Sequence, residues 1–376
     1  MRRKINPKQV SRVVFVGGGH AHLYSLKHAR LLIREGAEVT VIGPDQYHYY
    51  SGMSPGMLSG IYKPDDVRVD IQRLTQTNGA RFIKGHVTGI DPLKQTLFID
   101  NGENLEYDIV SFNLGSYVPA DLIKGAEEES YPIKPIVNLE LLRQTILSKI
   151  ATSIPRILIV GTGPAGVEVA GNIWRLVNQH GSKAEIILAG AEASLLSRLP
   201  SKAGIYAQES LVQREITIHS RCLISSMDNG IARTQGGKEI AYNIAVLATG
   251  IRPSQVFDYS IIETDTNGSL VVNAYLQSIS YPNIFGGGDC ITFQNMPLDM
   301  VGVYAVRQAP IILHNIWASL RGSSLKEFAP QKRYLQIINL GNGNGILVHG
   351  SLVLKGQWAF RLKDLIDRRF ISQFQY

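Results

Sequence analysis

Short apolar runs that end in glycines organise the chain. Residues 13–16 (VVFV) lead directly into glycines 17–19, and apolar residues then recur at helical spacing from Leu23 to Ile33, ahead of Gly36. An unbroken run of mostly β-branched residues is typical of a strand buried on both faces, and the later spacing predicts a helix. We expect a parallel strand, a tight glycine turn and a helix whose free N–H groups suit a pyrophosphate.

The same order returns at residues 157–168. This copy carries the complete G-x-G-x-x-G pattern, with Gly161, Gly163 and Gly166. In both copies a hairpin turn follows, and then another apolar strand that ends in a glycine, Gly115 or Gly250. Because order and spacing match, the sequence predicts two related dinucleotide-binding domains.

The residues that would contact an adenosine are less distinct. Dinucleotide-binding folds usually place an acid at the end of the second strand, but the strand expected at 38–42 is followed by Gly43, and Asp45 stands two positions later. Asp45 is either a substitute for that acid or an ordinary turn residue. At the end of the strand at 185–188 there is neither an acid nor a base, which leaves the choice between NADH and NADPH open. Within the strands and turns of 81–109, the backbone at Val87 could meet an adenine.

Two further segments could lie beside a ligand. The aromatic loop at 47–50, followed by glycine and proline up to residue 56, suggests a surface next to a planar ligand or an ordinary surface loop. Gly288-Asp289 follows a short apolar strand, where a carboxylate can approach a sugar or phosphate. His20, His22 and His48 would form a metal site only if the fold brought them together, and we expect no metal.

Two helices are expected in the last third of the chain. The first covers 302–317 and has Arg307-Gln308 near its middle. The second covers 358–370, where an aromatic and aliphatic face lies beside basic residues. Such a helix suits the surface of an anionic membrane, and it suits equally well a terminal helix docked on its own domain. Both interpretations stay open.

Composition narrows the class of protein. The 376 residues allow two or three domains, and 44% hydrophobic residues with 36 glycines fit an α/β protein rich in glycine turns. No apolar run reaches the ~18 residues that span a bilayer, and the first one breaks at Gly17, so we expect a cytoplasmic protein. Cys222 and Cys290 are too few for a disulfide framework. The net charge of +7 fits anionic dinucleotides or an anionic membrane, and without a basic-aromatic module we expect no nucleic acid.

Taken together, glycines 17–19, the fingerprint at 161–168, residues 248–250 (ATG) and Gly288-Asp289 resemble the FAD-dependent pyridine nucleotide-disulfide oxidoreductase superfamily. The resemblance covers almost the whole chain. Within the superfamily the chain is most similar to the branch of type II NADH:quinone reductases and sulfide:quinone reductases. It is more similar still to the flavoprotein domain fused to selenide, water dikinase, in GGGHAH at 17–22, YSGMSPG at 50–56, YAVRQ at 304–308 and the segment 358–370.

The resemblance implies a set of site residues. FAD would be held by Gly17, Gly19 and Asp289, and a nicotinamide cofactor by the second fingerprint, with Glu168 helping to orient the nicotinamide. The acceptor would meet the flavin near 54–56, Arg307-Gln308 and the C-terminal segment, so that Glu168 and Gln308 are the candidate catalytic residues. The candidate cofactor contacts are Gly17, Gly19, His20, Asp45, Val87, Gly115, Gly161, Gly163, Gly166, Gly250, Gly288, Asp289 and Arg307.

The chain departs from the superfamily pattern at three places. Disulfide reductases keep a C-x-x-x-x-C pair in the segment corresponding to 51–56, and its absence here excludes a dithiol relay at that position. Cys290 follows Asp289, but Cys222 belongs to the second domain, which disfavours sulfide chemistry. His22 replaces the third glycine of the first fingerprint, where close packing of helix on strand normally leaves no room for a side chain.

The resulting hypothesis is an α/β protein with two Rossmann-like domains, the NAD(P)H domain inserted into the FAD domain, and a small C-terminal α+β segment. We expect FAD binding by 1–125 and 272–325, NADH or NADPH binding by 126–271, and an interface or membrane-facing segment at 326–376. The leading function is an FAD-dependent NAD(P)H dehydrogenase that passes electrons to a quinone or similar acceptor. The alternatives are a non-turnover redox sensor or accessory flavoprotein, for example in selenium metabolism, and a sulfide:quinone reductase. The oligomeric state stays open, a homodimer included.

Overall fold

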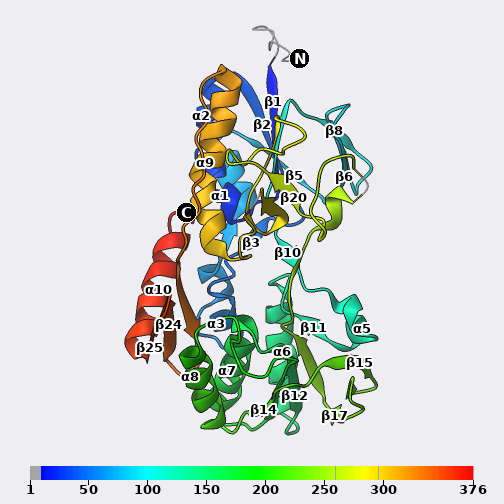
Figure 1. Cartoon of the computed structure of the whole chain (residues 1–376), viewed down its shortest axis with the longest axis vertical. Helices are drawn as coiled ribbons and strands as arrows, with labels where there is room; N and C mark the ends of the chain where they lie inside the picture. The colour runs from blue at the N-terminus through cyan, green and yellow to red at the C-terminus, as the bar shows by residue number, and fades with distance from the viewer. Residues whose placement is uncertain (1–9, 259, 295, 376) are drawn as a thin grey trace.

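The computed structural model describes residues 10–258, 260–294 and 296–375. Two α/β units lie one above the other, and a C-terminal layer runs along one side of both (Figure 1). The predicted α/β class with two Rossmann-type sheets is confirmed.

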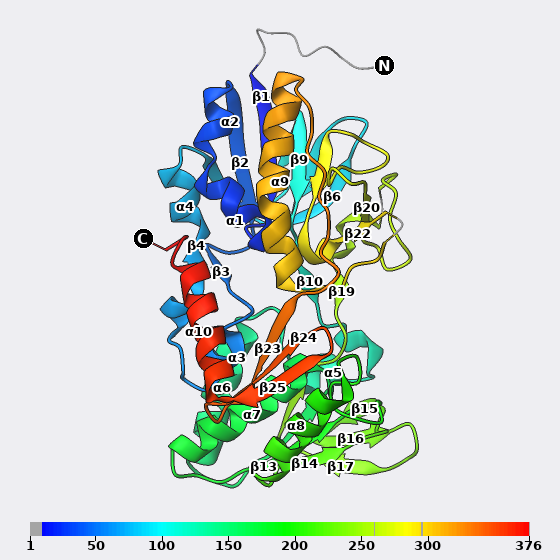
Figure 2. The same ribbon diagram turned by 60° about the vertical axis from the view of Figure 1, so that its left-hand side comes forward.

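The first unit is built on a parallel sheet with the strand order β21-β9-β1-β2-β5. These strands are β1 (Ser11–Val16), β2 (Ala37–Gly43), β5 (Arg81–Lys84), β9 (Ile109–Phe112) and β21 (Ile284–Gly286). Residues 13–16 are buried, as a strand covered on both faces requires. Figures 1 and 2 show helices α1 (His20–Lys27), α2 (Arg30–Arg34) and α9 (Gly302–Arg321) together on one side of the sheet.

Smaller elements complete the first unit. The helix expected from the spacing of residues 23–33 is divided into α1 and α2, and the chain leaves it at Gly36, whose φ of +84° suits glycine. The other elements are β3 (Tyr47–Tyr49) paired with β4 (Arg68–Asp70), α4 (Ile71–Thr77), β6 (Val87–Asp91), β7 (Thr96–Ile99), β8 (Asn104–Glu106), and β20 (Leu270–Val272) paired with β22 (Ile291–Phe293).

The second unit repeats the design with the parallel order β11-β18-β12-β13-β14. Its strands are β11 (Tyr131–Pro132), β12 (Arg156–Val160), β13 (Glu185–Ala189), β14 (Thr217–His219) and β18 (Ile244–Leu247). Around them lie α5 (Ala126–Glu129), α6 (Asn138–Ile150), α7 (Pro164–Gln179), α8 (Ser201–Val212) and the antiparallel strands β15 (Ile224–Asp228), β16 (Ile231–Thr234) and β17 (Glu239–Ala241). Asn138 is the first residue of α6, and its Nδ2 donates to the Pro132 carbonyl at 2.9 Å.

The chain passes between the units twice, at β10 (Ser116–Tyr117) and β19 (Arg252–Pro253), which pair antiparallel. Directly after β19, the 3₁₀ segment η3 (Gln255–Phe257) already packs in the first unit, where the Phe257 ring meets Phe112 at a centroid distance of 4.9 Å. The return crossing therefore lies near residue 253, earlier than the expected boundary at 272. Phe257 is an isolated apolar residue in an irregular segment, so periodicity could not assign it to either unit.

The C-terminal layer joins the two units. Strands β23 (Leu335–Asn339), β24 (Gly345–His349) and β25 (Leu352–Gly356) form an antiparallel sheet, and the turn between β24 and β25 contains Gly350, whose φ is +60°. The sheet packs against α7 and α8 of the second unit, and α10 (Gln357–Ile371) runs from it to the first unit (Figure 2). Beyond α10, Gln375 Nε2 donates to the carbonyls of Asp65 and Arg68. None of the helices in the described ranges is long and apolar enough to cross a bilayer.

His22 shows how the first unit tolerates a side chain at the third fingerprint position. Its imidazole turns into the protein, where Nδ1 donates to the Gly17 carbonyl at 2.6 Å and Nε2 accepts from Ser111 Oγ at 2.8 Å. Burial outweighs the bond to Gly17 and lowers the pKa of His22 to about 4, so the ring is neutral at physiological pH. The imidazole thereby replaces direct helix-strand packing with two hydrogen bonds.

We predict that His22→Ala lowers the free energy of unfolding by about 2–4 kcal/mol, because it leaves a cavity and two buried polar groups without partners. Chemical denaturation measures the change. His28→Ala is the matched control, since the His28 ring, directly after α1, bonds the carbonyl of Tyr24 and contacts the Tyr24 ring one turn earlier, and its effect should stay within about 1 kcal/mol. Equal effects of the two variants would contradict the role of His22.

Candidate functional site

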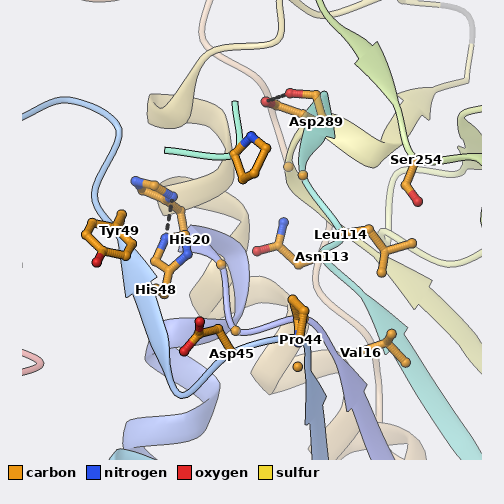
Figure 3. Close-up of a pocket in the computed structure, with 18 of the residues that line it drawn as sticks. Val16, His20, Pro44, Asp45, His48, Tyr49, Asn113, Leu114, Ser254 and Asp289 are labelled. Carbon is orange, nitrogen blue, oxygen red and sulfur yellow. Dashed lines mark hydrogen bonds between the residues drawn. The ribbon is translucent and has the colours of Figure 1, made fainter. Parts of the chain in front are cut away.

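A cavity of about 440 Å³ lies at the carboxyl ends of the first unit's strands (Figure 3). Its wall is formed by 16–20, 42–45, 47–49, 85–87, 113–116, 134–137 and 288–289, together with single residues of other segments. The structure brings eight of the sequence-predicted residues to it: Gly17, Gly19, His20, Asp45, Val87, Gly115, Gly288 and Asp289.

The glycine turn forms one wall because no side chain fits there. A Cβ on Gly17 would lie 2.2 Å from the Asn113 carbonyl oxygen, and one on Gly19 would lie 2.4 Å from Asn113 Oδ1. The Asn113 side chain ties this wall together, accepting from the Ala21 N–H at 3.1 Å and donating to the Gly287 carbonyl at 2.7 Å. Sequence analysis missed Asn113. The available signal was a polar residue at a strand end where the second copy has Ala248.

The Asp289 carboxylate is held by two residues that were also not predicted from the sequence. Ser116 Oγ donates to Asp289 Oδ2 at 2.7 Å, and Lys134 Nζ donates to both Ser116 Oγ (2.6 Å) and Asp289 Oδ2 (3.1 Å). All three side chains line the cavity, and Lys134 comes shortly after β11, an edge strand of the second unit's sheet. The cavity therefore contains a fixed carboxylate with a lysine beside it.

Two of the three candidate metal-binding histidines meet. His20 Nδ1 and His48 Nε2 are 3.2 Å apart, as the dashed line in Figure 3 shows, whereas His22 is turned away toward Ser111. Within the described part of the chain, no three His, Cys, Asp or Glu side chains are grouped to hold a metal ion.

The second unit has its own glycine turn. Gly161, at φ +125°, would place a Cβ 2.1 Å from the Ala248 carbonyl oxygen, and Gly166 would place one 1.8 Å from the carbonyl oxygen of Gly161. A Cβ on Gly163, directly before α7, would meet open space. The turn is thus packed on one side and free on the other, where a phosphate could approach the N-terminus of α7. Gly250 is exposed just beyond the neighbouring strand.

Glu168 lies on α7 and faces the C-terminal layer. Its Oε1 accepts from the Asn339 N–H at 2.8 Å. Burial raises the pKa of Glu168 to about 7, against the attraction of Lys363 and the bond from Asn339. At neutral pH this carboxyl can therefore gain or lose a proton.

The inner face of α10 carries a buried ion pair. Lys363 Nζ donates to Asp367 Oδ2 at 2.6 Å and to the Gly52 carbonyl at 2.5 Å, and Tyr50 Oη donates to Asp367 Oδ1 at 2.9 Å. These contacts fasten α10 to the loop at 50–52. Residues 54–56, expected near the acceptor, are buried in α3 (Ser54–Leu58), which packs against α6 and α7.

Arg307 and Gln308 separate, although they are neighbours in sequence. Gln308 is buried and its Oε1 accepts from the Gly288 N–H at 2.7 Å, whereas Arg307 is exposed on α9 and does not line the cavity. Cys290 is buried below the cavity wall, and burial raises the pKa of its thiol to about 12. Cys222 lies in the second unit, after β14. The two cysteines are thus in different units, and Cys290 stays a thiol.

Comparison with known proteins agrees with this geometry. Residues 11–309 match the family described as pyridine nucleotide-disulphide oxidoreductase. The type II NADH:quinone oxidoreductase of Staphylococcus aureus is 24% identical over 385 residues, covering 96% of this chain and 95% of that protein. The sulfide:quinone oxidoreductase of Aquifex aeolicus superposes with a TM-score of 0.82 at 18% identity, covering 97% of this chain and 92% of its own. NDH2 from Plasmodium falciparum in complex with NADH superposes with a TM-score of 0.81 at 16% identity, covering 97% and 98%. Because the match to this family covers most of the chain, the chain belongs to the pyridine nucleotide-disulphide oxidoreductases.

Proposed function

We propose that this chain is an FAD-dependent dehydrogenase that takes electrons from NADH and passes them to a quinone. The observation that carries the proposal is the cavity, where the glycine turn at 17–19 and the carboxylate of Asp289 converge. The S. aureus relative is named as a type II NADH:quinone oxidoreductase, which supports both the donor and the acceptor.

The residues of the cavity fit FAD. Gly17 and Gly19 leave a bare backbone wall at the N-terminus of α1, which would receive the pyrophosphate. Asp289, fixed by Ser116 and Lys134, would accept hydrogen bonds from the ribityl part. Asp45 and Val87 also line the cavity and would contact the adenosine. Bound FAD would supply the electron transfer itself.

The second unit would bind NADH. Gly161 and Gly166 set the shape of the turn, and Gly163 keeps open the space through which a pyrophosphate approaches α7. Gln308 acts as a positioning residue in this proposal, because its amide holds the backbone of Gly288, next to Asp289. Arg307 receives no role.

Glu168 would serve the acceptor side by holding a proton. A quinone takes up protons when it is reduced, and a carboxyl with a pKa near the operating pH is suited to supplying one. Glu168 meets this condition because it is enclosed between α7 and β23, close to Lys363.

The outer face of α10 would rest on a membrane. Trp358, Leu365 and Ile366 are 47%, 64% and 42% exposed, and Arg361 and Arg369 are exposed on the same helix. Exposed aromatic and aliphatic side chains beside arginines suit an anionic lipid surface. A quinone dissolved in the bilayer could then reach the protein without crossing water.

The first prediction concerns reduction by NADH. In an anaerobic titration, the visible absorbance of the FAD-bound protein should bleach with NADH and return with a soluble quinone. A protein that stays yellow in NADH would favour the accessory flavoprotein, and a protein that cannot take up FAD would contradict the proposal.

Gly163→Ala should raise the KM for NADH about tenfold or more without loss of FAD, since its methyl group enters space that only the ligand would fill. Gly236→Ala, in a hairpin of the same unit, is the matched control and should leave the KM unchanged.

The second prediction follows from the pKa of Glu168. A carboxyl with a raised pKa in the folded state stabilises the protein below its unfolded pKa, and this contribution is lost as pH rises through about 7. Relative to the wild type, Glu168→Gln should therefore gain about 1–3 kcal/mol in unfolding free energy between about pH 5 and pH 8. Denaturation at the two pH values measures this gain. Glu192→Gln, at an exposed carboxyl, should show no such trend, and a pH-independent effect of Glu168→Gln would contradict the assignment.

The third prediction concerns the membrane. Replacing Trp358, Leu365 and Ile366 together by serine or glutamine should weaken co-sedimentation with anionic phospholipid vesicles by about tenfold or more, because three buried apolar contacts with lipid are lost. The matched control replaces three exposed apolar residues away from α10, Leu93, Leu122 and Ile154. Equal binding of both variants and the wild type would rule out α10 as the membrane contact.

A further inference from the structure

The paired histidines at one end of the cavity have a geometry that the proposed function leaves unused. His20 is the first residue of α1 and His48 lies in β3, and their rings stand nearly perpendicular, with centroids 5.0 Å apart. A single hydrogen can lie between His20 Nδ1 and His48 Nε2, so one ring donates and the other accepts. His20 Nε2 is buried and has no hydrogen-bond partner among the described residues.

The surroundings of the pair keep it uncharged in the protein alone. The His20 ring is stacked on Phe370 at 5.9 Å and lies 5.1 Å from the ring of Tyr50. Burial, and then the charge of Lys134, hold the pKa of His20 well below its usual range. Burial, His20 and Lys134 do the same for His48. Each ring therefore carries one hydrogen at neutral pH.

The charges around the pair favour an anion. His20 belongs to the N-terminal turn of α1, and a Cβ on Gly302, the first residue of α9, would lie 4.0 Å from His20 Nε2. Two helix N-termini and Lys134 thus face this end of the cavity. The carboxylates nearby are already engaged: Asp289 with Lys134, Asp367 with Lys363 and Tyr50, and Asp45 with the Tyr47 N–H. His86, on the far wall, is paired with Asp100.

We propose that the His20–His48 pair binds one proton when the anionic phosphates of FAD enter the cavity, so that cofactor binding and proton uptake are coupled. This inference rests on the proposed function, because it takes FAD as the ligand of the cavity. The proton comes from solvent and goes to one imidazole, whose N–H donates to the other ring. In the protonated pair, His20 Nε2 carries a hydrogen whichever ring donates to the other, and it can donate that hydrogen to a phosphate oxygen.

The sign of the effect follows from the charges. In the protein alone, a proton on the pair would be repelled by Lys134 and by the positive ends of two helices, and no bound anion would offset this repulsion. A phosphate within about 4–6 Å reverses this balance and raises the pKa of the pair, which is about 4 at His20 in the protein alone, by roughly 1–3 units to between about 5 and 7. Because the two imidazoles share one hydrogen bond, the proton belongs to the pair and not to either ring alone.

Calorimetric titration of flavin-free, full-length protein with FAD tests the coupling. In buffers of different ionisation enthalpy at about pH 5, the wild type should take up between about 0.4 and 0.9 proton per FAD. His20→Asn should take up less than about a fifth of a proton while it still binds FAD. His28→Asn, at the far end of α1 and outside the cavity, should behave as the wild type.

A second measurement observes the imidazoles directly. In ¹⁵N-histidine NMR spectra of the wild type at about pH 5, FAD should produce an additional imidazolium signal that the flavin-free protein lacks, and His48→Gln should remove that signal. If the wild type binds no FAD, the proposed function fails. If it binds FAD while both imidazoles stay neutral and no proton is taken up, the coupling is overturned and the proposed function stands. Proton uptake that persists in His20→Asn would also overturn it, because the proton would then be held elsewhere.

Discussion

The structure depends on one close approach of backbone to backbone, made once in each unit. The first glycine of each turn lies directly on the carbonyl of the residue that follows the adjacent strand, where a Cβ would come within 2.2 Å at Gly17 and 2.1 Å at Gly161. This contact places the following helix with its N-terminus at the carboxyl edge of the sheet. In the first unit Asn113 extends the contact, since its side chain bonds both Ala21 on α1 and Gly287 beside β21. The cavity exists because these three chain segments are held at that distance.

The local part of this arrangement could be predicted from the sequence. An apolar run, a glycine turn and a helical spacing are all contained within a few residues, so both copies and their order were recognisable. The same holds for Gly17, Asp45 and Asp289, which reach the cavity because each follows the end of a strand. His22, the second histidine of GGGHAH, was recognisable as a departure from the glycine pattern. The hydrogen bond that accommodates its side chain was not, because Ser111 lies 89 positions away in the chain.

Long-range polar contacts could not be predicted from the sequence. Lys134 and Asp289 are separated by 155 positions, and no local pattern links a lysine between two prolines to a Gly-Asp turn. The spacing of apolar residues also predicts that a helix has an apolar and a polar face. It does not predict which element of the fold packs against each face. In α10 the face that turns inward contains the Lys363–Asp367 pair, whereas Trp358, Leu365 and Ile366 remain outside. In α9 the neighbours Arg307 and Gln308 part in the same way, one toward solvent and one into the unit.

The pairing of β10 with β19 has a consequence for how the chain could have evolved. Ser116 lies opposite Pro253 and Tyr117 opposite Arg252, so the second unit leaves and rejoins the first through adjacent strands. Meanwhile β9 and β21, on either side of the insertion in sequence, pair directly with each other in the sheet of the first unit. Topologically, the second unit is one long loop between neighbouring strands of its host. A module of this kind can be gained or exchanged as a single piece, because the register of the host sheet does not depend on what the loop contains.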